Sequence, residues 1–206
     1  MKLTLTSFLT LDGVVQAPGG PEEDRTGGFE YGGWLVPFAD EEMGRFMAGV
    51  LARAGAFLLG RRTYEIFAGS WPQVTDPDDP IATCLNALPK HVVSTTLERT
   101  DWHNSTLLGP DTAAEVKRLK AQPGPELQIH GSPTLARSLM ADGLIDEYNL
   151  LVYPVVLGTG QRLFPEGGLP TAFELTASRT TPAGVAIQTY RPAGPATFGS
   201  FGPEAG

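Results

Sequence analysis

Hydrophobic residues follow two different spacings along this chain. Between positions 43 and 54, apolar side chains recur every three to four residues, which places them on one face of an α-helix. This stripe consists of Met43, Phe46, Met47, Val50, Leu51 and Ala54. Elsewhere, short apolar runs end at glycine, proline or acidic residues, a pattern typical of strands joined by turns. The pattern therefore predicts a protein that mixes helices with short buried strands.

The predicted strands and helices alternate over most of the chain. We expect strands at about residues 3–10, 56–59, 91–94, 106–108, 127–130 and 147–156. We expect helices at about residues 43–54, 62–67, 81–88, 113–119 and 134–141. This alternation favours an α/β fold with a mostly parallel central sheet and helices on both of its faces. Two later alternating segments, 172–178 and 185–190, predict a C-terminal antiparallel hairpin.

One domain accounts for nearly the whole length. A chain of 206 residues can bury a sufficient core without disulfides or a structural metal. We expect this domain to cover residues 1–191. From Pro192 onward, proline and glycine are frequent and few side chains can be buried, so residues 192–206 are expected to form a flexible tail.

Charge and cysteine content exclude several classes of function. The net charge is −8 and the pI is near 4.8, which argues against a large nucleic-acid-binding surface. Cys84 is the single cysteine, and no Cys/His cluster has the spacing of a zinc site, so we expect no metal. The first residues resemble neither a signal peptide nor a membrane span. We therefore expect a cytoplasmic protein that binds no membrane.

Two glycine turns join a predicted strand to a predicted helix. The first is Gly60-Arg61-Arg62-Thr63, and the second is Gly131-Ser132-Pro133, where we expect Ser132 at the N-cap position and Pro133 as the first helical residue. Helix N-termini attract anions, and arginines are unfavourable there unless an anion faces them. Two such turns in one domain suit a dinucleotide.

Five segments, in this order, resemble the dihydrofolate reductase superfamily, and most closely its stand-alone bacterial members similar to the reductase domain of riboflavin biosynthesis. The segments are Ser7–Gly13, Gly60–Glu65, Val92–Thr96, Ile129–Ser132 and Tyr153–Phe164. The likeness covers residues 1–191. It implies a three-layer dihydrofolate-reductase-like fold, a homodimer, and an NADPH-dependent reductase that transfers a hydride to a small heterocyclic or carbonyl substrate. The activity would be similar to that of 5-amino-6-(5-phosphoribosylamino)uracil reductase or of dihydrofolate reductase.

The same resemblance implies which residues bind NADPH. They are Gly60, Arg61, Arg62, Thr63, Ser94, Thr95, His130, Gly131, Ser132, Pro133, Thr134 and Leu135. In this interpretation the first glycine turn holds the 2′-phosphate and pyrophosphate region, and the second lies along the pyrophosphate. His130 fits a hydrogen-bonded turn histidine better than a proton donor.

The substrate side matches less closely. Dihydrofolate reductases have a Trp, a Pro three residues later and an Asp two residues after that, whereas here Trp34 and Pro37 keep their spacing and Asp40 comes one residue late. Asp40 is thus either a catalytic acid or a helix cap. Asp12, at the end of a strand, is a second candidate acid or a turn residue. Trp34 and Phe38 either line a substrate pocket or belong to the core. An apolar Leu150 replaces the threonine of folate reductases, so folate is not the expected substrate.

A second hypothesis accounts for the same departures. The chain could be a non-catalytic NADPH-binding dimeric scaffold or regulatory protein that has kept the phosphate turns and lost the acid. The deaminase motif that accompanies the riboflavin reductase in bifunctional enzymes is also missing from this sequence.

Overall fold

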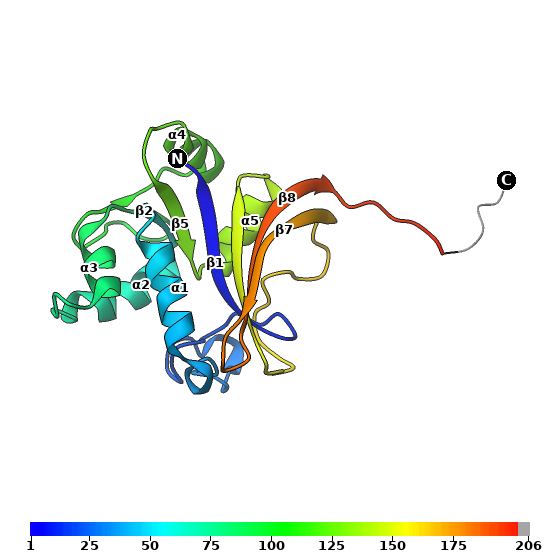
Figure 1. Ribbon diagram of the computed structural model, residues 1–206. Coiled ribbons are helices and arrows are strands. Elements are labelled where there is room, and N and C mark those ends of the chain that lie inside the picture. Colours follow the sequence, from blue (N-terminus) through cyan, green and yellow to red (C-terminus); the bar gives the residue numbers. More distant parts are fainter. Residues whose placement is uncertain (202–206) are drawn as a thin grey trace.

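The apolar runs of the sequence form one mixed sheet in the computed structural model, which describes residues 1–201 (Figure 1). Its strands are β1 (Leu3–Thr10), β2 (Ala54–Gly60), β3 (Lys90–Val93), β4 (Ser105–Leu107), β5 (Glu126–His130), β6 (Glu147–Tyr153), β7 (Thr171–Thr180) and β8 (Ala186–Pro195). Their order across the sheet is β4-β3-β2-β5-β1-β6-β8-β7. The strands from β4 to β6 in this order are parallel, whereas β8 runs antiparallel to both β6 and β7.

Helices cover both faces of the parallel part of the sheet (Figure 1). They are α1 (Glu41–Leu51), α2 (Arg61–Ser70), α3 (Pro80–Ala87), α4 (Thr112–Lys120) and α5 (Pro133–Ala141). Short 3₁₀ turns occur at Thr26–Gly28, Val36–Phe38 and Trp71–Gln73. The three-layer α/β fold expected from the sequence is confirmed, including the antiparallel end of the sheet.

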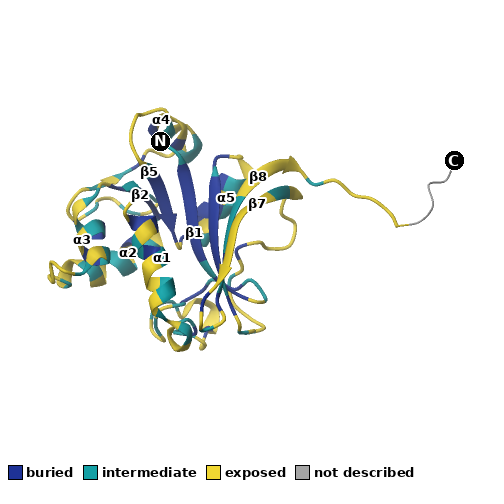
Figure 2. Ribbon diagram, viewed as in Figure 1, coloured by how far each residue is buried: buried dark blue, intermediate teal, exposed yellow. Residues whose placement is uncertain are grey.

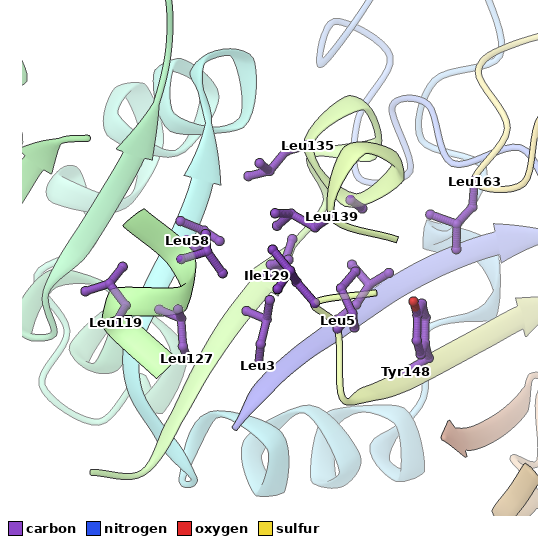
Figure 3. Packing of buried hydrophobic residues seen from close by; sticks show 14 of the residues in the cluster. Leu3, Leu5, Leu58, Leu119, Leu127, Ile129, Leu135, Leu139, Tyr148 and Leu163 are labelled. Atoms are coloured by element: carbon purple, nitrogen blue, oxygen red, sulfur yellow. The ribbon is translucent and has the colours of Figure 1, made fainter. Parts of the chain in front are cut away.

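Side chains alternate between the two faces of the sheet along each strand, so the core is divided between these faces. Leu3, Leu5 and Ile129 point toward α4 and α5 and pack there with leucines of both helices (Figure 3). On the opposite face, Phe57 and Leu59 pack with side chains of α1, α2 and α3. Strands buried on both faces are largely apolar, as parallel strands require (Figure 2). The burial of both faces fixes which side of each strand meets which helices.

The C-terminal hairpin is longer than the sequence pattern indicated. Strand β8 continues to Pro195, and Phe173 of β7 is paired with Pro192. Residues 192–195, which we assigned to a flexible tail, therefore belong to the sheet. The last part of that predicted tail, residues 202–206, lies outside the described residues.

Candidate functional site

A cavity of about 1000 Å³ lies along the carboxyl ends of the central parallel strands. The ends of β1, β2, β3 and β5 reach it through Phe8, Gly60, Val93 and His130 respectively. Ligands of open α/β sheets bind at the carboxyl ends of the strands. They bind where the loops after two nearby strands leave in opposite directions and open a crevice. In this sheet β5 separates β1 from β2, so the connections after them leave space between them.

The two glycine turns meet at this cavity and are hydrogen-bonded to each other. The Gly60 N–H donates to Ser132 Oγ (3.0 Å), and the Ser132 hydroxyl and N–H both donate to Thr63 Oγ1 (2.9 and 3.0 Å). Gly131 has a φ of +62°, and a Cβ there would lie 3.4 Å from Thr63 Oγ1. Turns separated by about seventy residues thus form one polar unit.

Ser132 occupies the N-cap position of α5 as expected, but its side chain makes no capping hydrogen bond. Its backbone is left-handed, with a φ of +53°, which is strained for a residue other than glycine. In this conformation the side chain turns away from the α5 amides and bonds to the first glycine turn instead. Pro133 begins the helix as expected.

The helices that begin at the cavity differ from the others in their N-terminal caps. Side chains of Asp40, Asp79 and Asp111 accept hydrogen bonds from the first amides of α1, α3 and α4. By contrast, α2 begins at Gly60 and α5 at Ser132 with no side-chain cap. The first N–H groups of α2 and α5 are therefore left for an anionic ligand, and their positive dipole ends favour one.

Polar and basic side chains surround these two helix ends. Arg62 pairs with Asp24 at 3.1 Å, and Arg61 contacts Glu65 at 3.4 Å. The structure brings the whole predicted cofactor set together in the wall of the cavity: Gly60, Arg61, Arg62, Thr63, Ser94, Thr95, His130, Gly131, Ser132, Pro133, Thr134 and Leu135. We call this part the polar half. The basic side chains, the hydroxyls and the uncapped amides suit the phosphates of a dinucleotide.

A second part of the cavity wall is apolar. It is lined by Met43, Met47, Leu51, Ile66, Phe67, Trp71, Ile81 and Leu85, and we call it the apolar half. These side chains come from α1, the second turn of α2, the 3₁₀ turn after it and α3. None carries a charge. A ligand there is held by shape and by contact with aromatic rings and flexible methionines.

Asp12 does not line the cavity but secures a loop. Its Oδ1 accepts hydrogen bonds from Thr10 Oγ1 (2.6 Å) and Leu157 N (3.2 Å), and its Oδ2 accepts one from Gly158 N (2.8 Å). Partial burial disfavours the charged form, but these hydrogen bonds outweigh burial and lower the pKa of Asp12 to about 2. Such a carboxylate stays ionised and is fully engaged, so it does not suit a proton donor.

Asp40 also lies outside the cavity wall. Its Oδ1 accepts a hydrogen bond from Met43 N at 2.9 Å, and its Oδ2 accepts one from Ala183 N at 3.0 Å in the turn between β7 and β8. The hydrogen bond from Met43, opposed by some desolvation, contributes most to lowering the pKa of Asp40. Of the two interpretations, helix cap and catalytic acid, the contacts fit the cap.

Trp34 and Phe38 belong to a neighbouring core cluster. Trp34 is buried, donates its indole N–H to Gln16 O at 2.8 Å and meets the ring of Tyr153 edge-on. Phe38 packs edge-on against the same tyrosine. Neither residue is part of the cavity wall, so the structure does not bring them to the substrate side.

Sequence reasoning missed the residues of the loop between β1 and α1 that reach the cavity. Gln16 is buried, and its amide joins this loop to the segment after β6 by donating to Thr26 O (2.9 Å) and accepting from Gln161 N (3.1 Å). Glu23 accepts hydrogen bonds from the amides of Gly19 and Gly20. The unusual length and glycine content of this loop were the available signal.

Metal-ligating side chains do not gather anywhere in residues 1–201. In this part of the chain, no group of three or more His, Cys, Asp or Glu side chains could hold a metal ion. Within the same residues, every helix is too short or too polar to cross a bilayer.

Comparisons with known proteins agree with this fold. The model of the RibD C-terminal domain family matches residues 1–187. The uncharacterized protein YyaP of Bacillus subtilis (strain 168) is 26% identical over 191 residues, which are 92% of this chain and 94% of YyaP. A putative riboflavin biosynthesis protein from Shewanella sp. PV-4 has a TM-score of 0.70 at 20% identity, covering 93% of this chain and 99% of its own. Dihydrofolate reductase from Enterococcus faecalis, solved with NADP(H), has a TM-score of 0.58 at 13% identity, with 93% and 96% covered.

Proposed function

Because the chain belongs to the RibD C-terminal domain family, we propose that it is an NADPH-dependent reductase of a small, neutral substrate. One observation supports this most strongly: two helices with uncapped N-termini, α2 and α5, meet at a cavity that also holds Arg61 and Arg62. The amides and guanidinium groups fit the pyrophosphate and the 2′-phosphate of NADPH. In this proposal the apolar half holds the substrate beside the nicotinamide.

The chemistry follows from this division of the cavity. When bound, the cofactor supplies a hydride to the carbon of a C=N or C=O bond, and a proton is added to the nitrogen or oxygen. The polar half orients the cofactor through its phosphates. The apolar half excludes water from the reacting carbon and aligns the substrate, so that proximity supplies much of the rate enhancement.

The proton is best supplied by water. Asp12 and Asp40, the acids expected from the sequence, are held by other contacts, and the apolar half presents no carboxylate. This arrangement also suits the alternative function, a non-catalytic NADPH-binding protein. We favour the reductase because the apolar half provides a second binding space next to the phosphate turns.

Thermal unfolding with each cofactor tests the binding step. At a hundredfold excess over its Kd, NADPH is expected to raise the Tm by about 5–10 °C, since binding adds about 2.7 kcal/mol to the stability of the native state. NADH, which lacks the 2′-phosphate, is expected to raise it less. The double variant Arg61→Ala/Arg62→Ala should lose this preference.

The matched control variant removes two arginines, and therefore the same positive charge, from the surface outside the cavity. Arg99 and Arg118 are exposed and lie outside the cavity, so Arg99→Ala/Arg118→Ala should keep the preference for NADPH. If neither cofactor shifts the Tm of the unmodified protein, both the reductase and the binding protein are excluded. A panel of neutral carbonyl and C=N compounds then separates the reductase from the binding protein, with reduction measured as the loss of NADPH absorbance. If no compound in the panel is reduced, the binding protein is favoured.

A further inference from the structure

A chain of hydrogen bonds runs along one face of β5 and ends at the cavity. Glu126, Gln128 and His130 alternate along the strand, so their side chains lie on the same face. The Gln128 amide donates to Glu126 Oε2 (2.9 Å), and Gln128 Oε1 contacts His130 Nε2 (3.0 Å). At the outer end, Arg53 Nε donates to Glu126 Oε1 at 2.9 Å. A buried polar row thus connects a surface ion pair to the cavity wall.

This row fixes which imidazole nitrogen of His130 carries the proton. Gln128 Nε2 must donate because both of its other partners, Val50 O (2.7 Å) and the paired carboxylate of Glu126, only accept. Gln128 Oε1 therefore faces His130 and accepts, so His130 Nε2 is protonated. Burial lowers the pKa of His130 to about 4, which keeps the ring neutral. In a neutral ring with Nε2–H, Nδ1 holds a free lone pair.

The second nitrogen has no partner and opens onto the cavity. The side chain of His130 is more than nine-tenths buried and forms part of the cavity wall. Among the described residues, Nδ1 accepts no hydrogen bond. It differs from His91 Nδ1 and Ser105 Oγ, which are unpaired and closed off from solvent. A buried acceptor fixed in one tautomer and left unpaired implies a donor on the ligand.

The contacts of the His130 ring place it where the two halves of the cavity meet. His130 meets Phe57 edge-on, and Phe57 shares a core cluster with Leu51 and Leu85 of the apolar half. Gln128, on the same face, bonds to the backbone of α1, the helix that supplies Met43 and Met47. The imidazole therefore lies on the α1 side of the sheet, at the boundary between the two halves of the cavity.

We propose that His130 selects the substrate: its Nδ1 accepts a hydrogen bond from an N–H or O–H group of an uncharged heterocycle that is otherwise held by the apolar half. The charged side chains of the cavity come from the polar half, from the loop after β1 and from Arg137 of α5, and none comes from the apolar half. A phosphorylated or carboxylated substrate would find no counter-charge there. This inference rests on the proposed function, because it assigns the polar half, except for His130 at its boundary, to the cofactor.

The tautomer is tested first, on the unmodified protein. Long-range ¹⁵N–¹H NMR correlations of the histidine rings should show His130 with Nε2 protonated and Nδ1 bare at pH 7. Assignment uses the spectrum of His130→Phe, or of His130→Asn if that variant fails to fold. A ring protonated at Nδ1 would overturn the proposal without any ligand or activity measurement.

Ligand selection is tested with a matched pair of probes. Quinoxalin-2(1H)-one is flat, neutral and carries one ring N–H, and its N1-methyl derivative lacks that donor. Binding to the unmodified protein, measured by calorimetry with and without NADP⁺, should be about five- to tenfold tighter for the N–H compound, the effect of one hydrogen bond. The ¹⁵N signal of His130 Nδ1 should move only with the N–H compound.

The control and the opposing outcomes separate this inference from the proposed function. His91→Phe removes a half-buried histidine that lies outside the cavity, and it should keep the discrimination. His130→Phe should abolish the discrimination. Equal affinity for the two probes, or no binding of the N–H compound, would overturn the role of His130. Failure of NADPH to shift the Tm would instead reject the reductase, whatever the probes do.

Discussion

At the scale of single residues, burial decides the charge of several polar side chains. Lys90 is fully buried on the sheet, and burial lowers its pKa to about 8. Its ammonium donates to the carbonyls of Leu85 (2.7 Å) and Leu88 (2.9 Å) at the end of α3 and lies 4.3 Å above the ring of Trp102. These contacts compensate the desolvation of the charge. His130 shows the opposite outcome, since its surroundings keep it neutral.

His130 gives the protein a specific dependence of stability on pH. Its pKa is about 4 in the folded state and about 6.5 when unfolded, so between these values the unfolded chain binds more protons. The stability that neutral His130 provides is therefore fully present above about pH 6.5. The free energy of unfolding falls by about 3 kcal/mol as the pH drops from there to 4. Urea unfolding followed between pH 7.5 and 4 measures this loss.

The variant His130→Gln isolates that contribution. It should remove most of the pH dependence in this window, while His91, whose pKa is also lowered by burial, contributes equally to both proteins and cancels. Asp12 does not interfere, because its pKa is lowered from 3.8 to about 2 and the stability it provides is lost only below pH 4. Parallel pH profiles of the unmodified and variant proteins would contradict the assignment.

At the scale of elements, the N-terminus of α1 is joined to the C-terminal hairpin through one carboxylate. Asp40 bonds both to the first turn of α1 and to Ala183 in the turn between β7 and β8. Asp40→Ala should lower the Tm because both contacts are lost, while the affinity for NADPH stays unchanged. Asp40→Ser, which can still cap α1, should recover part of the Tm.

A different result for Asp40 would point to chemistry. If Asp40→Asn lowered kcat with an unchanged Tm, the carboxylate would act in catalysis rather than as a cap. Steady-state kinetics on any compound reduced in the NADPH panel, measured with differential scanning fluorimetry on the same samples, decides between the two roles.

Apolar spacing and turn residues in the sequence predict single elements, but not how distant segments meet. Strand β1 occupies the predicted residues 3–10, and Met43 to Leu51 of the predicted stripe are helical, because apolar spacing reports burial directly. Ala54, which the pattern placed in the same stripe, instead begins β2. The first glycine turn could be recognised because arginine at a helix start is unfavourable unless an anion faces it, and the second because Gly131 and Pro133 separate an apolar strand from a helical pattern. Their mutual bonding through Ser132 could not, since it depends on two segments that are distant in sequence. The apolar half was missed for the same reason, because three helices and a 3₁₀ turn contribute to it.

At the scale of the whole molecule, the hairpin end of the sheet is the surface best suited to a second copy of the chain. Strand β7 is at the edge of the sheet, and no strand of residues 1–201 pairs with its outer side. Leu169, Leu175 and Phe164 expose apolar side chains on or near it. Long exposed edges with apolar side chains favour association. We expect a homodimer, the state that the family resemblance also implies.

Sedimentation equilibrium tests this expectation. The unmodified protein should sediment at twice the chain mass of 21.9 kDa. Leu175→Glu places a charge on the hairpin and should shift the population toward the chain mass. Val36→Glu, at an exposed apolar residue far from the hairpin in sequence, should leave the mass unchanged. A monomer at micromolar concentration would contradict the expected dimer.

If NADPH binds as proposed, the ion pair between Arg62 and Asp24 makes cofactor selection an exchange of anions. Arg62 already has a carboxylate partner at 3.1 Å, and that carboxylate also accepts a hydrogen bond from Thr26 N at 3.0 Å. An incoming 2′-phosphate must displace it, so the preference for NADPH over NADH measures the difference between two anions rather than the full attraction of a free guanidinium. Asp24→Asn removes the charge of the carboxylate that competes with the 2′-phosphate for Arg62. It should therefore increase the difference between the Tm shifts produced by NADPH and NADH. The acidic loop thus limits the discrimination that the arginines provide.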